Sequence, residues 1–504
     1  MPLSGDLLRL ADAVLFPGFP GHTPPDWLRR RLGEGLAGVA LFSRNIADPA
    51  QTARLTAALR AENPSVLIGT DEESGEVTRL EVATGSSRPG GYALGVVDDV
   101  VLTESLARDL GNDLARAGIT IDFAPSADVN SNPDNPVIGL RAFGADPSLV
   151  ARHTRAFVRG LQSAGVAASA KHFPGHGDTS VDSHHGVPVV AESGIEEALH
   201  PFREAIAEGV KVVMTGHLLV PSYDAELPAT LSPKVLTGLL REELGFDGMI
   251  ITDGIEMAAV AGAYGIGGAS ARAIAAGADA ICVGGERADE ATAAGIRDAI
   301  AAAVTQGLLP EERLADAARR VRELAAWAAS SGSPGAVDGH IGLTAARRAI
   351  RVTRRSTTAV LPLAPAPHVV ELAPEMNLAI DKNTPWGVGE PLRLLLPGTT
   401  VTRLTAAQAT GPELERLIGS AADHPLVVVV RDVHRYAWQS EALRHLLSAR
   451  PDAVVVEMGL PARSDLGAVH IATYGSARVC GQAAAEVLTG SVGDPAAEVL
   501  TGSL

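Results

Sequence analysis

The sequence predicts an α/β protein, with an N-terminal (β/α)8 barrel of the TIM type followed by a C-terminal α/β sandwich domain. In the first part of the chain, eight short apolar runs alternate with Ala-rich amphipathic segments. Strand–helix alternation is typical of a parallel sheet, and eight units favour a closed barrel over a doubly wound open sheet. A Ser/Gly/Pro-rich segment then separates these units from a second α/β series.

The predicted barrel strands are the apolar runs themselves. They are Ala13–Phe16, Gly38–Phe42, Ser65–Gly69, Ile119–Ala124, Val166–Ala170, Val210–Thr215, Met249–Thr252 and Ala280–Val283. The clearest helices between them are Asp48–Glu62, Val101–Ala117, Ser148–Ala164 and Glu286–Thr305. The first of these helices opens with Asp48-Pro49, a capping residue followed by a proline at the first helical position.

A chain of 504 residues is too long for one hydrophobic core, which predicts at least two domains. The segment SSGSPGAVDGHIG, Ser330–Gly342, is the best candidate linker. We therefore expect a barrel over 1–335, a linker and helix over 336–356, and a sandwich over 357–504. Its expected elements are a helix at Leu343–Arg355, strands at Thr358–Leu363, Val369–Leu372, Leu392–Leu396, Leu426–Val430, Ala453–Met458 and Val469–Tyr474, and helices at Gly411–Ala422 and Ser440–Ser448.

Charge and composition exclude several classes of function. A net charge of −17 argues against non-specific binding to nucleic acid or to an anionic membrane surface. The 2 cysteines, Cys282 and Cys480, exclude a disulfide framework. No segment reaches the roughly 20 apolar residues of a membrane span, and the N-terminus lacks a signal-peptide pattern, so a cytoplasmic location is expected.

Ionisable residues follow strand after strand of the predicted barrel. Barrel active sites are built at the carboxyl ends of the strands, so these positions predict a site there. The residues are Asp71, Glu72, Glu73 and Arg79 after the third strand, Asp128, Asp134 and Arg141 after the fourth, 171–185 after the fifth, His217 after the sixth, and Asp253 and Glu256 after the seventh.

Asp253 is the sharpest single candidate. It directly follows the apolar run MIIT, and the end of a buried strand would hold its carboxylate rigidly in the barrel mouth. A nucleophile or an electrostatic stabiliser needs such a position. The structural alternative is that Asp253 caps a helix beginning at Ile255.

The most polar loop is AASAKHFPGHGDTSVDSHHGVP, Ala167–Pro188. Within it, Asp182 can orient His184 as a general acid/base near neutral pH. A zinc site is the alternative, with ligands drawn from His172, His176, Asp178, Asp182, His184 and His185. Zinc would leave Lys171 and Asp253 unexplained, and the loop has no cysteine and no helical spacing, so we expect no metal and no cofactor. A phosphate cradle at Gly175 and Gly177 lacks the P-loop context.

Four segments of the chain resemble the β-N-acetylhexosaminidase branch of family 3 glycoside hydrolases. They read KHFPGHGDTSVDSH, ITDGIEM, FAPSADVNSNPDNPVIGLRAFGADP and GVALFSRN. The resemblance covers residues 10–330, and the K-H-F-P-G-H-G motif followed by D-x-H is specific to the branch. The remainder of the chain is similar, with looser motifs, to the α/β-sandwich domain of two-domain members.

The resemblance implies a retaining double displacement. Asp253 would be the nucleophile, and His184, polarised by Asp182, would be the acid/base. The usual retaining mechanism uses two carboxylates, so the His–Asp pair is a variation on it. An imidazolium is an acid of suitable strength near pH 7. Members of this branch can use phosphate as the acceptor, which a histidine repels less than a glutamate would.

By the same resemblance, five residues match sugar-binding positions: Asp71, Arg141, Lys171, His172 and Arg79. Arg79 has an alternative role, because it could form a supporting ion pair with Glu73. The family usually reads D-Q-E-G-G at Asp71, whereas this chain reads D-E-E-S-G. Glu72 and Ser74 are therefore departures from the family pattern.

The sequence thus predicts an exo-acting β-N-acetylglucosaminidase on small glycosides such as cell-wall fragments or chitooligosaccharides. The alternatives are a β-glucosidase or dual-specificity enzyme, a phosphate-using phosphorylase, and a catalytically silent sugar-binding barrel. The D-x-H loop favours the amino sugar, and the presence of Asp182, His184 and Asp253 argues against a silent protein. The expected partner is a small-molecule glycoside, with neither nucleic acid nor membrane, and the oligomeric state stays open.

Overall fold

The computed structural model describes residues 4–182, 186–191, 194–332, 334–356 and 361–491. The chain forms two compact units. The N-terminal unit comprises Met1–Glu73 and Asp99–Asp338, and the C-terminal unit comprises Ser74–Asp98 and Gly339–Leu504. The segment Ser74–Asp98, which follows a strand of the N-terminal unit, therefore belongs to the C-terminal unit.

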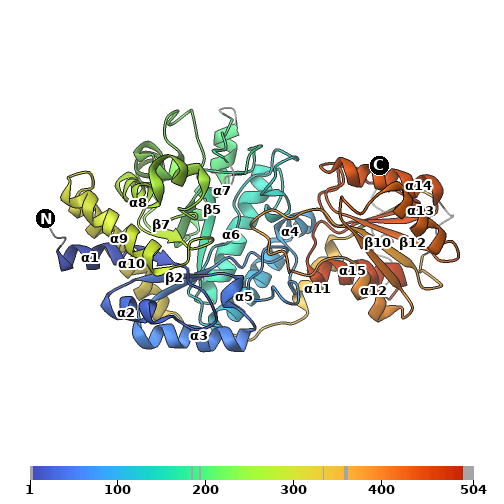
Figure 1. The fold of residues 1–504 in the computed structure, drawn as a ribbon, viewed down its shortest axis with the longest axis horizontal. Coiled ribbons are helices and arrows are strands. Elements are labelled where there is room, and N and C mark those ends of the chain that lie inside the picture. The colour runs from blue at the N-terminus through green and yellow to red at the C-terminus, as the bar shows by residue number, and fades with distance from the viewer. Residues whose placement is uncertain (1–3, 183–185, 192–193, 333, 357–360, 492–504) are drawn as a thin grey trace. The chain divides into compact units, whose positions relative to one another are not determined.

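The N-terminal unit is built on parallel strands (Figure 1). These are β1 (Leu15–Pro17), β2 (Gly38–Leu41), β3 (Leu67–Thr70), β4 (Ile121–Asp122), β5 (Ala167–Phe173), β6 (Val212–Thr215), β7 (Met249–Thr252) and β8 (Ile281–Val283). Each overlaps one of the strands that the sequence predicts.

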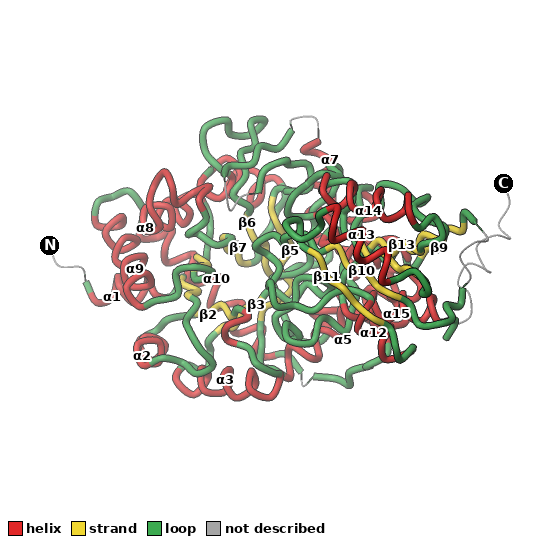
Figure 2. The backbone as a smooth tube through the Cα atoms, turned by 45° about the vertical axis from the view of Figure 1, so that its right-hand side comes forward, coloured by secondary structure: helices red, strands yellow, loops and turns green. Residues whose placement is uncertain are grey.

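Helices alternate with these strands and lie outside them, as α2, α3, α8 and α9 do in Figure 2. Their bounds are α1 Gly5–Asp12, α2 Asp26–Glu34, α3 Pro49–Glu62, α5 Val100–Arg116, α6 Pro147–Ser163, α7 Ile195–Ala207, a π-type helix Lys234–Glu243, α8 Ala258–Ala276, α9 Glu290–Thr305 and α10 Glu311–Ser330. The predicted cap of α3 is confirmed, because the Asp48 side chain accepts a hydrogen bond from the Gln51 amide at 2.7 Å.

The parallel sheet of the N-terminal unit is curled around a shared core. Six strands pair in the order β2-β3-β4-β5-β6-β7, and β1 pairs in parallel with β8. Ile251 of β7 bridges to Ala280, the residue before β8. One apolar cluster takes buried residues from every one of these strands, among them Phe16, Ala40, Leu67, Ile121, Ala167, Val212, Met249 and Cys282. The expected parallel α/β class is confirmed.

The C-terminal unit contains a second sheet, with strand order β11-β10-β12-β13-β14-β9. Its strands are β9 (Arg351–Arg354), β10 (His368–Leu372), β11 (Thr400–Leu404), β12 (Leu426–Val430), β13 (Val454–Glu457) and β14 (Val469–Ala472). Neighbouring strands are parallel except β9, which pairs antiparallel with β14. The helices are α4 (Gly91–Val97), α11 (Ile341–Ala349), α12 (Gly389–Leu395), α13 (Gly411–Ser420), α14 (Ala437–Ala449) and α15 (Arg478–Thr489).

Both faces of this second sheet are buried. Along β12, Val427 and Val429 pack in the cluster that includes residues of α11, α12 and α15, whereas Val428 and Val430 pack in the cluster that includes α13 and α14. Strands buried on both faces read as continuous apolar runs, and the run LVVVV of β12 is such a sequence.

Two sequence predictions for the C-terminal unit are wrong. The helix expected over Leu343–Arg355 ends at Ala349, and Arg351–Arg354 form β9 instead. The β-branched Val352 and Thr353 fit a strand better than a helix, and exposed arginines at both ends of β9 suit a sheet edge.

The second error exchanges a helix for a strand. The apolar run Leu392–Leu396 was expected to be a strand but lies largely in α12, and the strand in this region is β11, which the sequence did not predict. A short apolar run cannot be assigned to helix or strand from its periodicity alone. Part of another predicted strand, residues 358–360 of Thr358–Leu363, lies outside the described residues.

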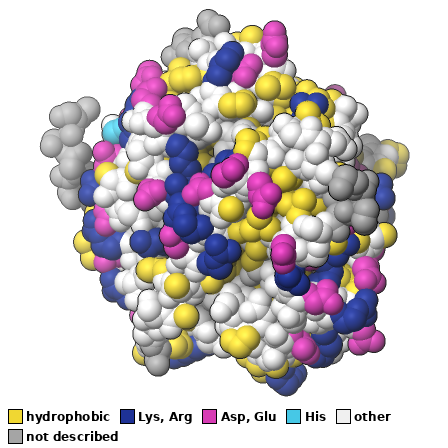
Figure 3. Space-filling model, turned by 90° about the vertical axis from the view of Figure 1, so that its left-hand side faces the viewer, with side chains coloured by type: hydrophobic (Ala, Val, Ile, Leu, Met, Phe, Trp, Pro, Cys, Tyr) yellow, Lys and Arg dark blue, Asp and Glu magenta, His cyan; other side chains and the backbone are white. Residues whose placement is uncertain are grey.

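Figure 3 shows one face of the molecule, on which acidic and basic side chains are interspersed. Exposed ion pairs of the N-terminal unit have the same mixed character, for example Arg30–Glu290 and Arg319–Glu323. Within the described residues, every helix is too short or too polar to cross a bilayer.

Candidate active site

A buried lysine links two carboxylates at the ends of β3 and β5. Lys171 lies in β5, and its Nζ is 2.7 Å from Asp71 Oδ1 and 2.6 Å from Glu73 Oε1. Burial lowers the pKa of Lys171, but the charges of Asp71 and Glu73 raise it above its ordinary value, so the side chain is an ammonium. The Asp71 side chain stays 23% exposed while that of Lys171 is 2% exposed. Lys171 therefore orients Asp71, and Asp71 is the member that a ligand can reach.

Glu73 joins Lys171 to an arginine. The Arg141 guanidinium donates from Nε to Glu73 Oε2 at 2.8 Å and from Nη2 to Glu73 Oε1 at 2.7 Å. Burial raises the pKa of Glu73, yet the charges of Arg141 and Lys171 hold it well below its usual range. An ion pair with Glu73 was the alternative role suggested for Arg79, and the structure gives Glu73 the charged partners Arg141 and Lys171. Arg79 belongs to the C-terminal unit and donates to the carbonyls of Thr78 and Ala379.

The chain of polar contacts continues through His172 to Asp128. Arg141 Nη2 lies 3.3 Å from His172 Nε2, and His172 Nδ1 lies 2.8 Å from Asp128 Oδ2. A guanidinium has no acceptor, so Nε2 must accept and Nδ1 carries the proton that is donated to Asp128. Burial raises the pKa of Asp128, but His172 and His176 hold it below its ordinary value. The carboxylate therefore fixes the tautomer and the ring orientation of His172.

The loops after β4 and β5 interlock around Asp128. Its Oδ1 accepts the backbone amide of His176 at 2.7 Å, and Asn135 Nδ2 donates to the carbonyl of His176 at 2.8 Å. A Cβ on Gly177 would lie 1.8 Å from the carbonyl oxygen of Val129, so only glycine permits this approach. The Asn-rich segment after β4 thus positions the histidine-bearing loop, and His176 shapes the loop as a structural residue.

Asp253 follows β7 directly, and the alternative role as a helix cap is wrong. Helix α8 begins at Ala258, with Met257 at its N-cap. The amide of Gly254 donates instead to Asp253 Oδ1 at 2.7 Å. The next carbonyl, of Gly254, accepts from Nε2 of the buried His217 at 3.0 Å. His217, which follows β6, therefore holds the turn that carries Asp253.

The charges of three predicted site residues affect the pKa of the Cys282 thiol. Burial raises the pKa of this β8 thiol far above its ordinary value, and the charges of Glu256, Asp71 and Asp253 raise it further, while Lys171 lowers it. Residues from the ends of β3, β5 and β7 thus act on the same buried thiol. This agrees with a single site at the carboxyl ends of the strands.

The predicted acid/base pair is only partly described. Asp182 is buried, at 9% exposure. His184 lies outside the described residues, as does His185. The coupling of Asp182 to His184 therefore stays a prediction.

Sequence reasoning gave no role to three residues that the structure places in or beside the network. Asp128 and His217 were noticed only as ionisable residues after predicted strands, and Asp122 lies inside β4. Burial raises the pKa of Asp122 well above its usual value, and its Oδ1 accepts the amide of Glu72 at 2.9 Å. An acidic residue in an otherwise apolar strand was the available signal for Asp122. Nothing local in the sequence pairs Asp128 with His172, which lies 44 residues away.

A metal centre is not formed by the described residues. No three His, Cys, Asp or Glu side chains among them are arranged to hold an ion. His172 and His176, two members of the alternative zinc set, bond to Asp128 and to Thr179 instead.

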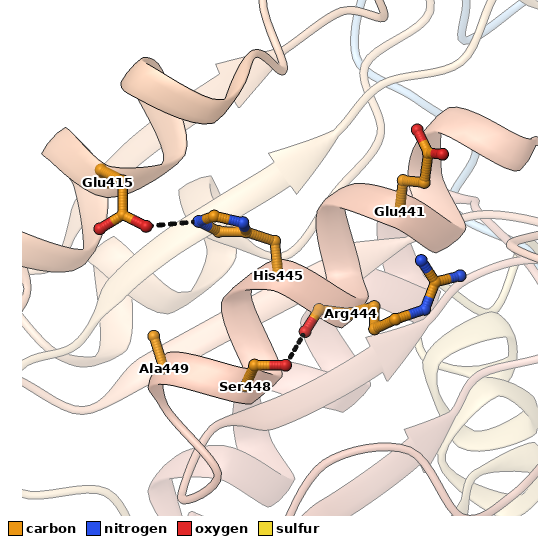
Figure 4. Close-up of a pocket in the computed structure, with 6 residues that line it drawn as sticks. All are labelled: Glu415, Glu441, Arg444, His445, Ser448 and Ala449. Carbon is orange, nitrogen blue, oxygen red and sulfur yellow. Dashed lines mark hydrogen bonds and ion pairs between the residues drawn. The ribbon is translucent and has the colours of Figure 1, made fainter.

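A pocket in the C-terminal unit is a second place where ionisable groups gather (Figure 4). It lies between α13 and α14 and is lined by Glu415, Glu441, Arg444, His445, Ser448 and Ala449. Figure 4 shows Glu415 and His445 facing each other, with His445 Nε2 2.7 Å from Glu415 Oε1. Both side chains are more than a third exposed, so solvent screens the pair. The network around Lys171 is the better candidate, because its charges are buried and mutually oriented.

Known proteins share both the sequence and the fold. Residues 28–324 match the family described as "Glycosyl hydrolase family 3 N terminal domain". The chain is 40% identical over 220 residues to the beta-hexosaminidase LpqI of Mycobacterium tuberculosis, covering 42% of this chain and 56% of that protein. It is 38% identical over 250 residues to the beta-hexosaminidase of Stenotrophomonas maltophilia, covering 48% of this chain and 73% of that protein.

A solved structure matches along almost the whole chain. The family 3 beta-N-acetylglucosaminidase of Paenibacillus sp. str. FPU-7 superposes with a TM-score of 0.86 at 35% identity, covering 96% of this chain and 97% of that one. The sequence match to LpqI, by contrast, spans only about half of that relative's length. The family match covers more than half of the chain. Together with the strand-end site, these findings show that the chain belongs to glycosyl hydrolase family 3.

Proposed function

We propose that this protein is a retaining exo-β-N-acetylhexosaminidase that removes terminal N-acetylglucosamine from small glycosides such as cell-wall fragments or chitooligosaccharides. The observation that carries the proposal is the buried Lys171 ammonium, which lies 2.7 Å from the partly exposed Asp71 carboxylate, together with Asp253 directly after β7 of the same unit. The beta-hexosaminidase and beta-N-acetylglucosaminidase names of the relatives support the amino-sugar substrate.

In the proposed reaction, an Asp253 oxygen forms a bond to the anomeric carbon as the glycosidic bond breaks. The leaving oxygen takes a proton from the imidazolium of His184, which Asp182 orients. His184 then removes a proton from water, and that oxygen displaces Asp253 with net retention. The rigid turn held by His217 supports this role for Asp253, because a nucleophile gains from fixed geometry.

Sugar recognition falls to the buried network. Asp71, partly exposed and pinned by Lys171, accepts hydrogen bonds from ring hydroxyls. Arg141 and His172 lie further along the network, where Arg141 can donate to further hydroxyls. The sugar-binding role that the resemblance gives to Arg79 stays a prediction.

Phosphate is the alternative acceptor. The charge balance of the network favours water, because the cations Lys171 and Arg141 are matched by the carboxylates of Asp71 and Glu73. No uncompensated cation of this group is left to hold a dianion. Adding phosphate to the assay decides the point, since phosphorolysis would release a sugar 1-phosphate in place of the free sugar.

The proposal includes the finer architecture. We propose that β1 to β8 close into a (β/α)8 barrel, and that the C-terminal unit is the α/β sandwich of two-domain relatives. The bridge from β7 to the start of β8 and the core cluster drawn from every strand support the closed barrel. A barrel mouth would exclude bulk water from Asp253 better than an open sheet edge.

The test of the proposed function is Asp253→Ala on p-nitrophenyl N-acetylglucosaminide. We expect turnover to vanish while the fold survives, because Asp253 is only half-buried. Azide should restore turnover and give the glycosyl azide of opposite anomeric configuration, since a small anion replaces the lost nucleophile. Asp247→Ala is the matched control, because Asp247 is an exposed aspartate paired with Arg320. Retained activity in Asp253→Ala would remove this residue as the nucleophile.

The acid role of His184 is tested with His184→Ala on a series of aryl leaving groups. We expect poor leaving groups to be slowed about 100-fold or more and good ones far less, since only the former need a proton. Equal losses across the series would contradict the acid role.

A further inference from the structure

The segment Ser74–Asp98 is anchored in the C-terminal unit by a buried ion pair. Glu76 Oε2 accepts hydrogen bonds from the Arg431 guanidinium and, at 3.2 Å, from the Ser476 hydroxyl. The side chains of Arg431 and Glu76 are only 6% and 8% exposed. Breaking a buried pair leaves an uncompensated charge, so this contact fixes the segment firmly.

The pair lies where open α/β sheets usually bind a ligand. The strand order β11-β10-β12-β13-β14 reverses direction at β10, and the crevice beyond the carboxyl ends of β10 and β12 is then the topological switch point. Arg431 directly follows β12, and its Nη1 lies 2.8 Å from the sulfur of Met376, which follows β10. The chain's own Glu76 therefore supplies the anion at this position.

The turn between Glu73 and Glu76 is stiff. Ser74 and Gly75 both have left-handed backbone conformations, with φ of 66° and 67°. A Cβ on Gly75 would lie 2.6 Å from the Cα of Gly90, so the turn is packed directly against backbone. The Gly75 amide also donates to the Arg88 carbonyl at 3.0 Å. Two residues separate Glu76, held by Arg431, from Glu73, held by Arg141 and Lys171.

We propose that the Glu76–Arg431 ion pair makes the C-terminal unit a positioning element for the glycoside site. Through the stiff Ser74-Gly75 turn, the pair fixes the backbone that carries Asp71 and Glu73, and with it the orientation of Lys171 and Arg141. Glu76 and Arg431 are positioning residues that touch no substrate. The inference rests on the proposed function for the identity of the ligand. The positioning of Asp71 and Glu73 by the ion pair does not depend on that function.

The test compares Glu76→Gln, Arg431→Gln and the double variant with the full-length wild type. We expect kcat/KM on p-nitrophenyl N-acetylglucosaminide to fall about 10- to 100-fold in each, chiefly through a higher KM, because small displacements of oriented groups are costly. Arg431→Lys, which keeps the charge, should recover part of the loss. Thermal unfolding is measured in parallel.

The double variant separates positioning from simple stability. It removes both buried charges together, so it should fold even if a single variant does not. If the folded double variant has the wild-type KM, the pair serves stability alone and the proposal is overturned. Arg347→Gln is the control, because it breaks an ion pair with Glu486 inside the C-terminal unit. Its Tm should fall while its KM stays unchanged.

Hydrogen exchange distinguishes failure of this inference from failure of the proposed function. If the wild type cleaves no sugar of a p-nitrophenyl panel, the proposed function fails. Exchange in peptides covering Leu67–Glu73 and Ala167–Phe173 still tests the positioning. Faster exchange there in the double variant than in wild type or Arg347→Gln supports it, and unchanged exchange overturns it.

Discussion

The two sheets of this protein place acidic residues at the same structural position and use them in opposite ways. In the N-terminal unit, Asp71 follows β3 and is bound by a buried ammonium while staying partly exposed. In the C-terminal unit, Glu457 ends β13, is fully buried, and accepts backbone amides of Asp432 and Gly459 at 2.9 and 2.7 Å. In the first arrangement the carboxylate of Asp71 stays accessible to a ligand. In the second, the carboxylate of Glu457 binds backbone amides and stabilises the loops.

The pKa values of two buried glutamates follow from this difference. Burial raises the pKa of Glu457 to about 8, and Asp432 adds to the rise, because only backbone amides oppose it. Glu73 is also buried, but Arg141 and Lys171 hold its pKa well below the ordinary value. The position at a strand end therefore does not make a carboxylate functional. A charged partner that keeps it ionised and a path to solvent do so.

The largest expected effect comes from removing the ammonium that defines the N-terminal arrangement. Lys171→Met should lower kcat/KM by about 100-fold or more, because Asp71 loses the group that orients it. It should also destabilise the fold by about 3 kcal/mol, since Glu73 keeps only Arg141 as its charged partner. Steady-state kinetics and urea unfolding measure the two effects. Near wild-type kcat/KM in the folded variant would show that Asp71 does not need the ammonium, and the contrast between the two sheets would then be wrong.

Asp128→Asn should have a smaller effect. Asparagine has one acceptor oxygen where aspartate has two, and its NH2 group cannot accept the hydrogen bond from His172 Nδ1. The His172 ring therefore loses its fixed tautomer. We expect kcat/KM to fall about tenfold, because the orientation of the His172 ring is no longer held by a carboxylate. The Ser126 hydroxyl also donates to Asp128, at 2.9 Å, so Ser126→Ala is a milder control. A wild-type kcat/KM in Asp128→Asn would argue against this role of Asp128.

The C-terminal arrangement predicts a pH dependence of local stability. The pKa of Glu457 is about 8 in the folded state against 4.5 ordinarily, so the folded state retains a proton that the unfolded state has lost. The resulting stabilisation is complete below pH 4.5 and is lost as the pH rises through about 8. Hydrogen exchange in β12 and β13, corrected for intrinsic rates, should therefore show easier opening at pH 9 than at pH 6. Glu457→Gln should flatten this dependence, and an equal slope in the variant would sink the explanation.

The smallest expected effect is that of a chelator. EDTA should leave hydrolysis unchanged, because the proposed reaction needs only protein groups. Inhibition that added zinc reverses would revive the metal reading of the histidine-rich loop. Asp178, one of its candidate ligands, accepts the Ala191 amide at 3.1 Å and so already has a structural partner.

The site could be predicted from the sequence only in part. Asp71 and Asp253 were selected because they follow predicted strands, whose carboxyl ends converge in a parallel α/β fold. The sugar-binding roles of Asp71 and Lys171 came from the family resemblance. The pairing of Glu73 with Arg141 was not predicted, because the two residues lie 68 positions apart in the sequence. Local pattern could not assign Leu392–Leu396 either, because helix and strand both bury short apolar runs.

The sequence by itself determined the parallel α/β class, the strand positions in the N-terminal unit and the family motifs, because periodicity and short motifs are local properties of the chain. Tertiary structure alone decided which charges neutralise one another. It set the Lys171–Glu73–Arg141–His172–Asp128 order and placed Ser74–Asp98, a segment that follows a strand of one unit, in the other unit. Ion pairs and pKa values depend on distances between residues far apart in the chain, and only folding fixes those distances.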